Sequence, residues 1–202
     1  FGNVVLLPLW LQQYMGYTAT WAGLATAPVG ILAIIISPWV GKNVAKIDPR
    51  KLASVAFLGF ATVLVMRSHF NTQADFNTIL VPTVLQGAAM AFFFIPLQAI
   101  IFSGLPAQRM PAAAGLSNFV RITAGAVGTS IFTTLWDSRA SMHHAHLSET
   151  VSRSNDAAAA TLGQLNASGY SPEQGLAMVN RLIDQQAYTL AATDLFYLSA
   201  VL

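Results

Sequence analysis

Long apolar runs, separated by shorter polar connectors, dominate the pattern of this chain. Hydropathy divides it into six apolar segments, at residues 1–15, 20–40, 52–66, 78–103, 111–136 and 187–202. A helix that crosses a membrane needs about 20 mostly apolar residues. We therefore predict an all-α, polytopic membrane protein in which each segment is a membrane helix, and we expect the first and last segments to be parts of longer helices.

The connectors predict how these helices are oriented. Successive connectors alternate between the two sides of the membrane, so residues 41–51 and 104–110 share one side. That side holds five basic residues: Lys42, Lys46, Arg50, Lys51 and Arg109. The short connectors of the other side hold only Arg67, which we expect to extend its charge to the interface at the end of the short third segment. The positive-inside rule then makes the first side cytoplasmic.

The long connector at residues 137–186 has helix signals of its own. Ser171, Pro172 and Gln174 form a capping-box start. Apolar residues then recur at helical spacing, at Leu176, Val179, Leu182, Ile183 and Leu190. These signals predict an amphipathic outer helix that continues into the last apolar segment. The alanine run at residues 157–160, with Leu162 and Leu165, predicts a second, short helix.

Composition excludes several classes of protein. Of 202 residues, 54% are hydrophobic and only 9% are charged, whereas a soluble domain has about 25% charged residues. The net charge of +2 comes from few ionisable groups, so no nucleic-acid partner is expected. The chain has no cysteine, which excludes disulfides, thiolate metal sites and a cysteine nucleophile.

Two strings carry a family resemblance. Residues 16–42 read GYTATWAGLATAPVGILAIIISPWVGK, and residues 103–131 read SGLPAQRMPAAAGLSNFVRITAGAVGTSI. Both resemble the C-terminal half of EmrB/QacA-type multidrug exporters, which are fourteen-helix drug:proton antiporters of the major facilitator superfamily. The resemblance extends over essentially the whole chain.

The resemblance implies a function and partners. Members of this family exchange protons for amphipathic toxic compounds across the bacterial inner membrane, in some cases together with a periplasmic adaptor (membrane fusion) protein and an outer-membrane channel. By this resemblance residues 1–136 are membrane helices, residues 137–186 form a periplasmic loop with an amphipathic helix, and residues 187–202 begin the last membrane helix. The family's main proton-coupling carboxylates would lie in its other half. No cofactor and no metal are implied.

The connector at residues 41–51 resembles the basic loop motif of the superfamily, G-x-x-x-D-R-x-G-R-R/K. Its matching positions are Gly41, Lys46, Arg50 and Lys51. Ala45 stands where the motif has aspartate, and Asp48 stands where it has its second glycine. The connector is therefore either a conformational loop of the transport cycle or simply a solvated cytoplasmic turn.

Arg121 is the strongest candidate for a functional residue. It is the only basic residue inside the segment at residues 111–136, and an arginine near the centre of a membrane helix costs roughly 2.5 to 3.5 kcal/mol. Asn118, Gly125 and Gly128 share its helical face. We expect this face to contact a translocation pathway, or alternatively to hold Arg121 on backbone carbonyls, with the glycines admitting a neighbouring helix.

A second candidate face lies on the segment at residues 78–103. Gln86, Met90, Phe94 and Gln98 follow one another at intervals of four, and Met and Phe can repack around different apolar ligands. This face is predicted to line the pathway, although such stripes are also typical of plain core. Asp194 is the only carboxylate inside an apolar segment, and we expect it to act at the outer mouth or as a polar partner rather than in proton coupling.

Other functions are compatible with a membrane fold and remain open. An uptake permease for a small solute is the alternative to an exporter, although few charges and many Met and Phe residues favour export. An enzyme would need a nucleophile with a base, or paired metal ligands, at membrane depth. The sequence offers no such set, and His143, His144 and His146 have no evident carboxylate partner for a metal site.

Overall fold

The computed structural model describes the backbone of residues 2–153 and 155–202 and the side chains of residues 2–149 and 159–202. Every regular element in these ranges is a helix. They are α1 (Gly2–Gln13), α2 (Ala19–Thr26), α3 (Pro28–Asn43), α4 (Pro49–Ser68), α5 (Phe76–Phe102), the 3₁₀ helix η1 (Ala107–Arg109), α6 (Met110–Arg153), α7 (Asn155–Ala167) and α8 (Pro172–Val201).

Among the described residues, three helical stretches are long and apolar enough to cross a membrane, at Ala19–Asn43, Pro49–Ser68 and Phe76–Phe102. The first of them comprises α2 and α3, which join at Ala27 with helical backbone angles, just before Pro28. A proline removes one helical hydrogen bond without ending the run of helical residues. The prediction of an all-helical membrane fold is confirmed.

Short polar caps define where these helices begin. Asp48 accepts a hydrogen bond from the backbone N–H of Arg50 at 3.0 Å and starts α4. Asp75 accepts from the backbone N–H of Thr78 at 2.9 Å and starts α5. Each cap satisfies a backbone donor that has no partner inside its helix. The ends of the α3–α4 and α4–α5 connectors are therefore determined by local hydrogen bonds.

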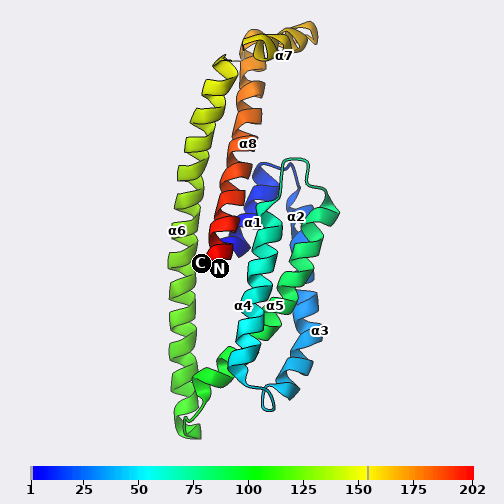
Figure 1. Cartoon of the computed structure of the whole chain (residues 1–202). Helices are drawn as coiled ribbons and strands as arrows, with labels where there is room; N and C mark the ends of the chain where they lie inside the picture. The colour runs from blue at the N-terminus through cyan, green and yellow to red at the C-terminus, as the bar shows by residue number, and fades with distance from the viewer. Residues whose placement is uncertain (1, 154) are drawn as a thin grey trace.

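Helices α3, α4 and α5 lie side by side in one part of the molecule (Figure 1). Helices α5 and α3 approach closely at Gly87 of α5, where an added Cβ atom would clash with the carbonyl oxygen of Val29. Only glycine permits this contact between α5 and α3. Helix α8 packs against both α4 and α6, and it connects this part to the long α6.

An aromatic cluster joins α1, α6 and α8. Tyr14 stacks on Tyr188 with ring centroids 4.2 Å apart. Trp136 Nε1 donates to the Tyr188 carbonyl at 3.0 Å, and Trp10 Nε1 donates to Thr189 Oγ1 at 3.0 Å. Trp and Tyr favour the membrane–water interface, where a ring can be buried while its polar atom finds a partner.

Beyond this cluster, α6 and α8 continue as a pair of helices that extends past the other connectors, and α7 lies across their ends (Figure 1). The sequence predicted a helix in each of these two regions, and α7 and α8 are both helical. Ser171 and Gln174 form the capping box of α8, and Leu162 and Leu165 of α7 pack against Gly175. We name residues 137–186 the outer arm.

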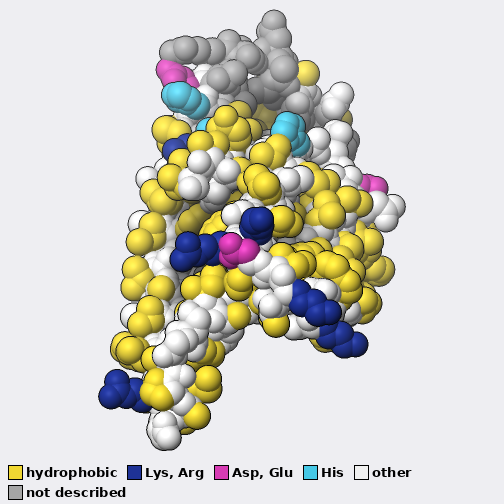
Figure 2. All heavy atoms as spheres, turned by 60° about the horizontal axis from the view of Figure 1, so that its bottom comes forward, with side chains coloured by type: hydrophobic (Ala, Val, Ile, Leu, Met, Phe, Trp, Pro, Cys, Tyr) yellow, Lys and Arg dark blue, Asp and Glu magenta, His cyan; other side chains and the backbone are white. Residues whose placement is uncertain are grey.

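Basic side chains surround the opposite end of the molecule. Figure 2 looks toward the end where α3 meets α4 and α5 meets α6, and Lys and Arg side chains stand out there around a largely apolar surface. The five basic residues that the sequence placed on one side are all exposed. The two connectors therefore share one end, as their alternation predicts.

Candidate functional site

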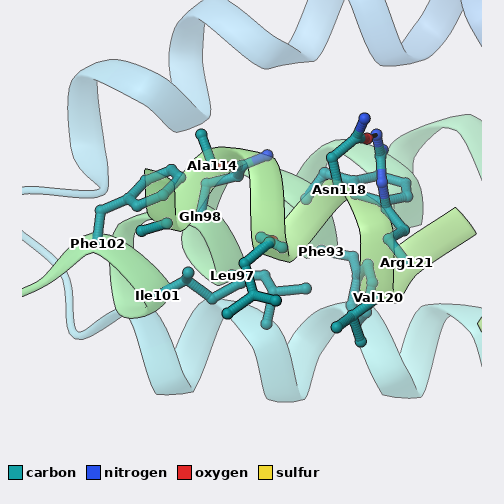
Figure 3. A pocket seen from close by; sticks show the side chains of 13 residues that line it. Phe93, Leu97, Gln98, Ile101, Phe102, Ala114, Asn118, Val120 and Arg121 are labelled. Atoms are coloured by element: carbon teal, nitrogen blue, oxygen red, sulfur yellow. Dashed lines mark hydrogen bonds between the residues drawn. The ribbon is translucent and has the colours of Figure 1, made fainter. Parts of the chain in front are cut away.

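A cleft of about 580 Å³ separates the second half of α5 from the first half of α6. Four of the predicted pathway residues line it: Phe94, Gln98, Asn118 and Arg121. Figure 3 shows Arg121 and Asn118 together toward one end of the cleft, with Gln98 and Phe102 toward the other. The remaining lining is mostly apolar. The structure thus brings together residues from two separately predicted faces.

Arg121 is held by its own helix. Its Nη2 donates to Asn118 Oδ1 at 2.5 Å, and its Cζ lies 6.0 Å from the centroid of the Phe94 ring. It also borders a neighbouring cleft of about 600 Å³ with Gly125 and Thr129. At Gly128 an added Cβ would meet nothing within 4 Å, so no described residue forms the helix contact predicted there. Arg121 is exposed and can reach a molecule in either cleft.

The other predicted residues of α5 line a different cavity. Gln86, Met90 and Phe94 border a space of about 310 Å³ between α1, α4 and α5. An interval of four residues advances about 40° around a helix, so the face turns by about 120° between Gln86 and Gln98. The stripe therefore starts on the α4 side and ends on the α6 side, with Phe94 lining both spaces.

The position of the Arg67 side chain differs from the sequence prediction. Its charge was expected to reach the membrane interface, but its side chain is only 1% exposed. Nη2 donates to Gln86 Oε1 at 2.6 Å and to Thr83 Oγ1 at 3.4 Å, and Cζ lies 6.0 Å from the Phe196 ring of α8. Helices α5 and α8 enclose the end of α4, which the hydropathy of α4 alone does not reveal.

A sequence signal for this burial exists. The buried residues of α4 are Leu52, Ala56, Val63 and Arg67, at spacings of four, seven and four. These spacings place them on one helical face. Arg67 therefore continues the buried face of α4, and the periodicity could have placed it in the core. Asn3 and Phe93, which also line the α4–α5 cavity, have no comparable signal.

Asp194 lies apart from both cavities. Its Oδ2 accepts from Arg139 Nη1 at 3.0 Å and contacts His143 Nε2 at 2.9 Å. A third contact joins His144 Nε2 to Asp184 Oδ1 at 3.4 Å. All three contacts join α6 to α8, and Asp194 has the polar partners that its position in an apolar segment led us to expect. No group of three potential metal ligands occurs within the described part of the chain.

The candidate conformational loop is a short turn at the basic end. Gly41, Lys46, Arg50 and Lys51 are all exposed, and none of them lines either cavity. Asp48, which departs from the superfamily motif, is the N-cap of α4. The departure therefore has a structural role of its own.

Comparisons with known proteins show which family the chain resembles. The model of the Major Facilitator Superfamily matches residues 1–129. The chain is 45% identical to the "Multidrug export protein EmrB" of Escherichia coli K12 over 201 residues, which is 99% of this chain and 39% of that protein. It is 38% identical to the "Fatty acid resistance protein FarB" of Neisseria gonorrhoeae over 201 residues, which is 100% of this chain and 40% of that protein.

A third relative is the "Probable multidrug resistance protein EmrY" of Escherichia coli K12, 41% identical over 202 residues, or 99% of this chain and 39% of that protein. The chain thus spans about two fifths of the length of these relatives and matches their C-terminal part. No solved structure matches it. With its helical membrane fold and a family match over residues 1–129, the chain belongs to the major facilitator superfamily.

Proposed function

We propose that this chain forms part of a transporter that exports amphipathic drugs and toxic compounds in exchange for protons. The observation that carries the proposal is the cleft between α5 and α6, which is about 580 Å³ and mostly apolar, with Arg121, Asn118, Ser117 and Gln98 as its polar groups. Ligand sites of this kind combine an apolar wall with few polar anchors. The names of the relatives, which refer to multidrug export and fatty acid resistance, support the same function.

In this proposal each predicted residue has a place in transport. Phe94 and Gln98 of α5 form one wall of the cleft, and Arg121 with Asn118 forms the facing wall. Gln86 and Met90 contribute to the pathway from the neighbouring cavity on the α4 side. Substrate sites of such transporters lie near the membrane midplane between two halves. Asp194 stabilises the outer end through Arg139 and His143. The turn with Gly41, Lys46, Arg50 and Lys51 acts at the cytoplasmic end.

Transport in liposomes tests the export mechanism. Purified full-length protein is reconstituted, a neutral fluorescent amphiphile is added outside, and the lumen is made acidic. Because protons leaving the lumen would drive the amphiphile inward, dye should accumulate only with protein and a pH gradient. Accumulation without the gradient would contradict proton exchange. Accumulation of a small polar solute in place of the dye would favour the alternative, an uptake permease.

We also propose an orientation in the bacterial inner membrane, with the basic end in the cytoplasm and the outer arm in the periplasm. The exposed Lys and Arg residues of the basic end support it, because such residues favour the cytoplasmic side. Single cysteines at Ala45 and Ser168, in a cysteine-free full-length protein, test this with an impermeant thiol reagent. In intact cells position 168 should react and position 45 should not. The reverse pattern would overturn the orientation.

The outer arm is the proposed docking surface for a periplasmic adaptor protein, which would connect the transporter to an outer-membrane channel. Leu176, Met178 and Leu182 expose 58%, 46% and 51% of their surface on α8. The changes Leu176→Glu and Leu182→Glu should together reduce adaptor crosslinking, whereas the control Ser168→Glu, at an already polar exposed site, should not. Unchanged crosslinking in the double variant would contradict docking and would indicate that the outer arm is a lid that contacts only its own chain.

A further inference from the structure

Arg67 is a buried charge for which the described part of the chain supplies no counterion. The ion pairs found in that part join Arg139, His143 and His144 to aspartates and do not include Arg67. Its two hydrogen-bond acceptors, Gln86 and Thr83, are neutral. Burying a charge costs several kcal/mol unless the charge is both paired with an opposite charge and hydrogen-bonded. The charge of Arg67 is therefore only partly compensated.

The same side chain has an unused donor. Among the described residues, neither the buried Arg67 Nε nor the buried Asn3 Oδ1 has a hydrogen-bond partner. Both residues line the cavity of about 310 Å³ between α1, α4 and α5. The two ends of an amide have nearly the same shape, so Asn3 could equally present its N–H₂ group to the cavity. An acceptor placed there would meet donors from two helices.

The rest of this cavity is apolar and aromatic. Phe93 packs edge-on against Phe57, with ring centroids 5.5 Å apart, and against Phe60 at 5.8 Å. Met90 and Leu64 complete a lining that has few polar groups besides those around Arg67. The volume is at the lower end of the range of about 300–1,000 Å³ for small-molecule sites. The cavity thus combines one cationic end with an apolar body.

We propose that this cavity binds organic carboxylates with an apolar tail, and that Arg67 recognises the carboxylate. One carboxylate oxygen accepts a hydrogen bond from Nε, and the amide of Asn3, which lines the same cavity, supplies a second donor. The apolar tail lies against Phe57, Phe60 and Phe93. This assignment rests on the proposed export function, and it distinguishes the Arg67 cavity from the Arg121 cleft, which lies on the other side of Phe93 and Phe94.

Equilibrium binding to the purified full-length protein tests the assignment without requiring transport. The probes are 6-phenylhexanoate and its neutral analogue 6-phenylhexanamide, titrated by calorimetry. The unaltered protein should bind the carboxylate more tightly. In Arg67→Gln this preference should fall by about 10- to 100-fold, the range for one charge-assisted hydrogen bond. Arg67→Lys should keep part of it, because the charge remains while the fork geometry is lost.

The matched control is Arg109→Gln, which removes an exposed arginine at the basic end and should leave the preference unchanged. Equal affinity of the unaltered protein for the two probes would overturn the proposal, and so would a full preference in Arg67→Gln. Failure of the liposome assay with intact carboxylate binding would instead remove the export mechanism and leave this site standing.

A crosslinking measurement covers the case in which Arg67→Gln does not fold. The unaltered protein is illuminated with a phenylhexanoate that carries a diazirine at the ring, and labelled peptides are identified by mass spectrometry. Labels should fall at residues 57–67 and 90–94, and excess unlabelled phenylhexanoate should reduce them. Labels confined to residues 113–121 would place the carboxylate in the Arg121 cleft and overturn the assignment.

Discussion

Arg67 and Arg121 lie on two helices that were both predicted to cross the membrane, and the fold treats them in opposite ways. Along the sequence Arg121 is deep within an apolar segment, whereas Arg67 follows the end of one. In the structure Arg67 is almost completely buried and Arg121 is exposed. Position within an apolar segment therefore does not determine which charge enters the packed interior.

The neighbours of each arginine explain the difference. Arg67 donates to Gln86 of α5 and lies over the Phe196 ring of α8, so it connects three helices. Arg121 donates to Asn118, three residues earlier on the same helix. A side chain oriented by its own helix remains available to a ligand or another segment. The comparison supports our proposal that Arg121 acts in transport, whereas Arg67 is a charge that the packed helices themselves accommodate.

The largest expected effect tests the Arg121 side of the comparison. Arg121→Ala should reduce export by more than about tenfold, the effect of losing one charge-assisted hydrogen bond, while the protein reaches the membrane at normal levels. Arg121→Lys should retain part of the export if charge suffices, and should fail equally if two acceptors are held by the guanidinium fork. Normal drug export by Arg121→Ala, or a defect in abundance alone, would make Arg121 a structural residue.

The second effect tests the Arg67 side through stability. Replacing both Arg67 and Gln86 by apolar residues, in the double variant Arg67→Met and Gln86→Leu, should stabilise the protein by about 1–4 kcal/mol, because a partly compensated buried charge is removed. The single change Arg67→Met should gain less, since it leaves Gln86 Oε1 without its donor. Thermal unfolding in detergent measures both.

Arg121→Met is the matched control for that measurement. Because Arg121 is exposed, this change should alter the stability by no more than about 0.5 kcal/mol. A double variant less stable than the unaltered protein would mean that Arg67 has a counterion in the full-length transporter, and the contrast between the two arginines would then be wrong.

The smallest effect concerns the ring beside Arg121. Phe94→Leu removes the cation–π contact at 6.0 Å, which is worth about 0.5–1 kcal/mol at an exposed site. The affinity for an exported amphiphile should fall about two- to fivefold. Phe102 lines the same cleft, but among the described residues its ring has no cation–π contact with an arginine. The change Phe102→Leu should therefore have a smaller effect. Equal losses in both variants would show that only apolar area is involved.

Much of this protein can be predicted from the sequence, because the relevant signals are local. Apolar segments predicted the helices, and the capping box at Ser171 located the start of α8. The intervals of four on α5 and the face of Asn118 and Arg121 on α6 also follow from a helix of 3.6 residues per turn. Such features involve residues only a few positions apart, so a single helix is enough to define them.

What only the tertiary structure decided involves partners that are distant in the sequence. Arg67 pairs with Gln86 across 19 residues, and Asp194 pairs with His143 and Arg139 across 51 and 55 residues. No local rule states which helix covers another. Burial of Arg67 requires α5 and α8 to close over the end of α4, and the division of the α5 stripe between two cavities depends on where α4 and α6 lie. The sequence determined the chemistry of each helical face, and the packing of the helices determined which faces meet.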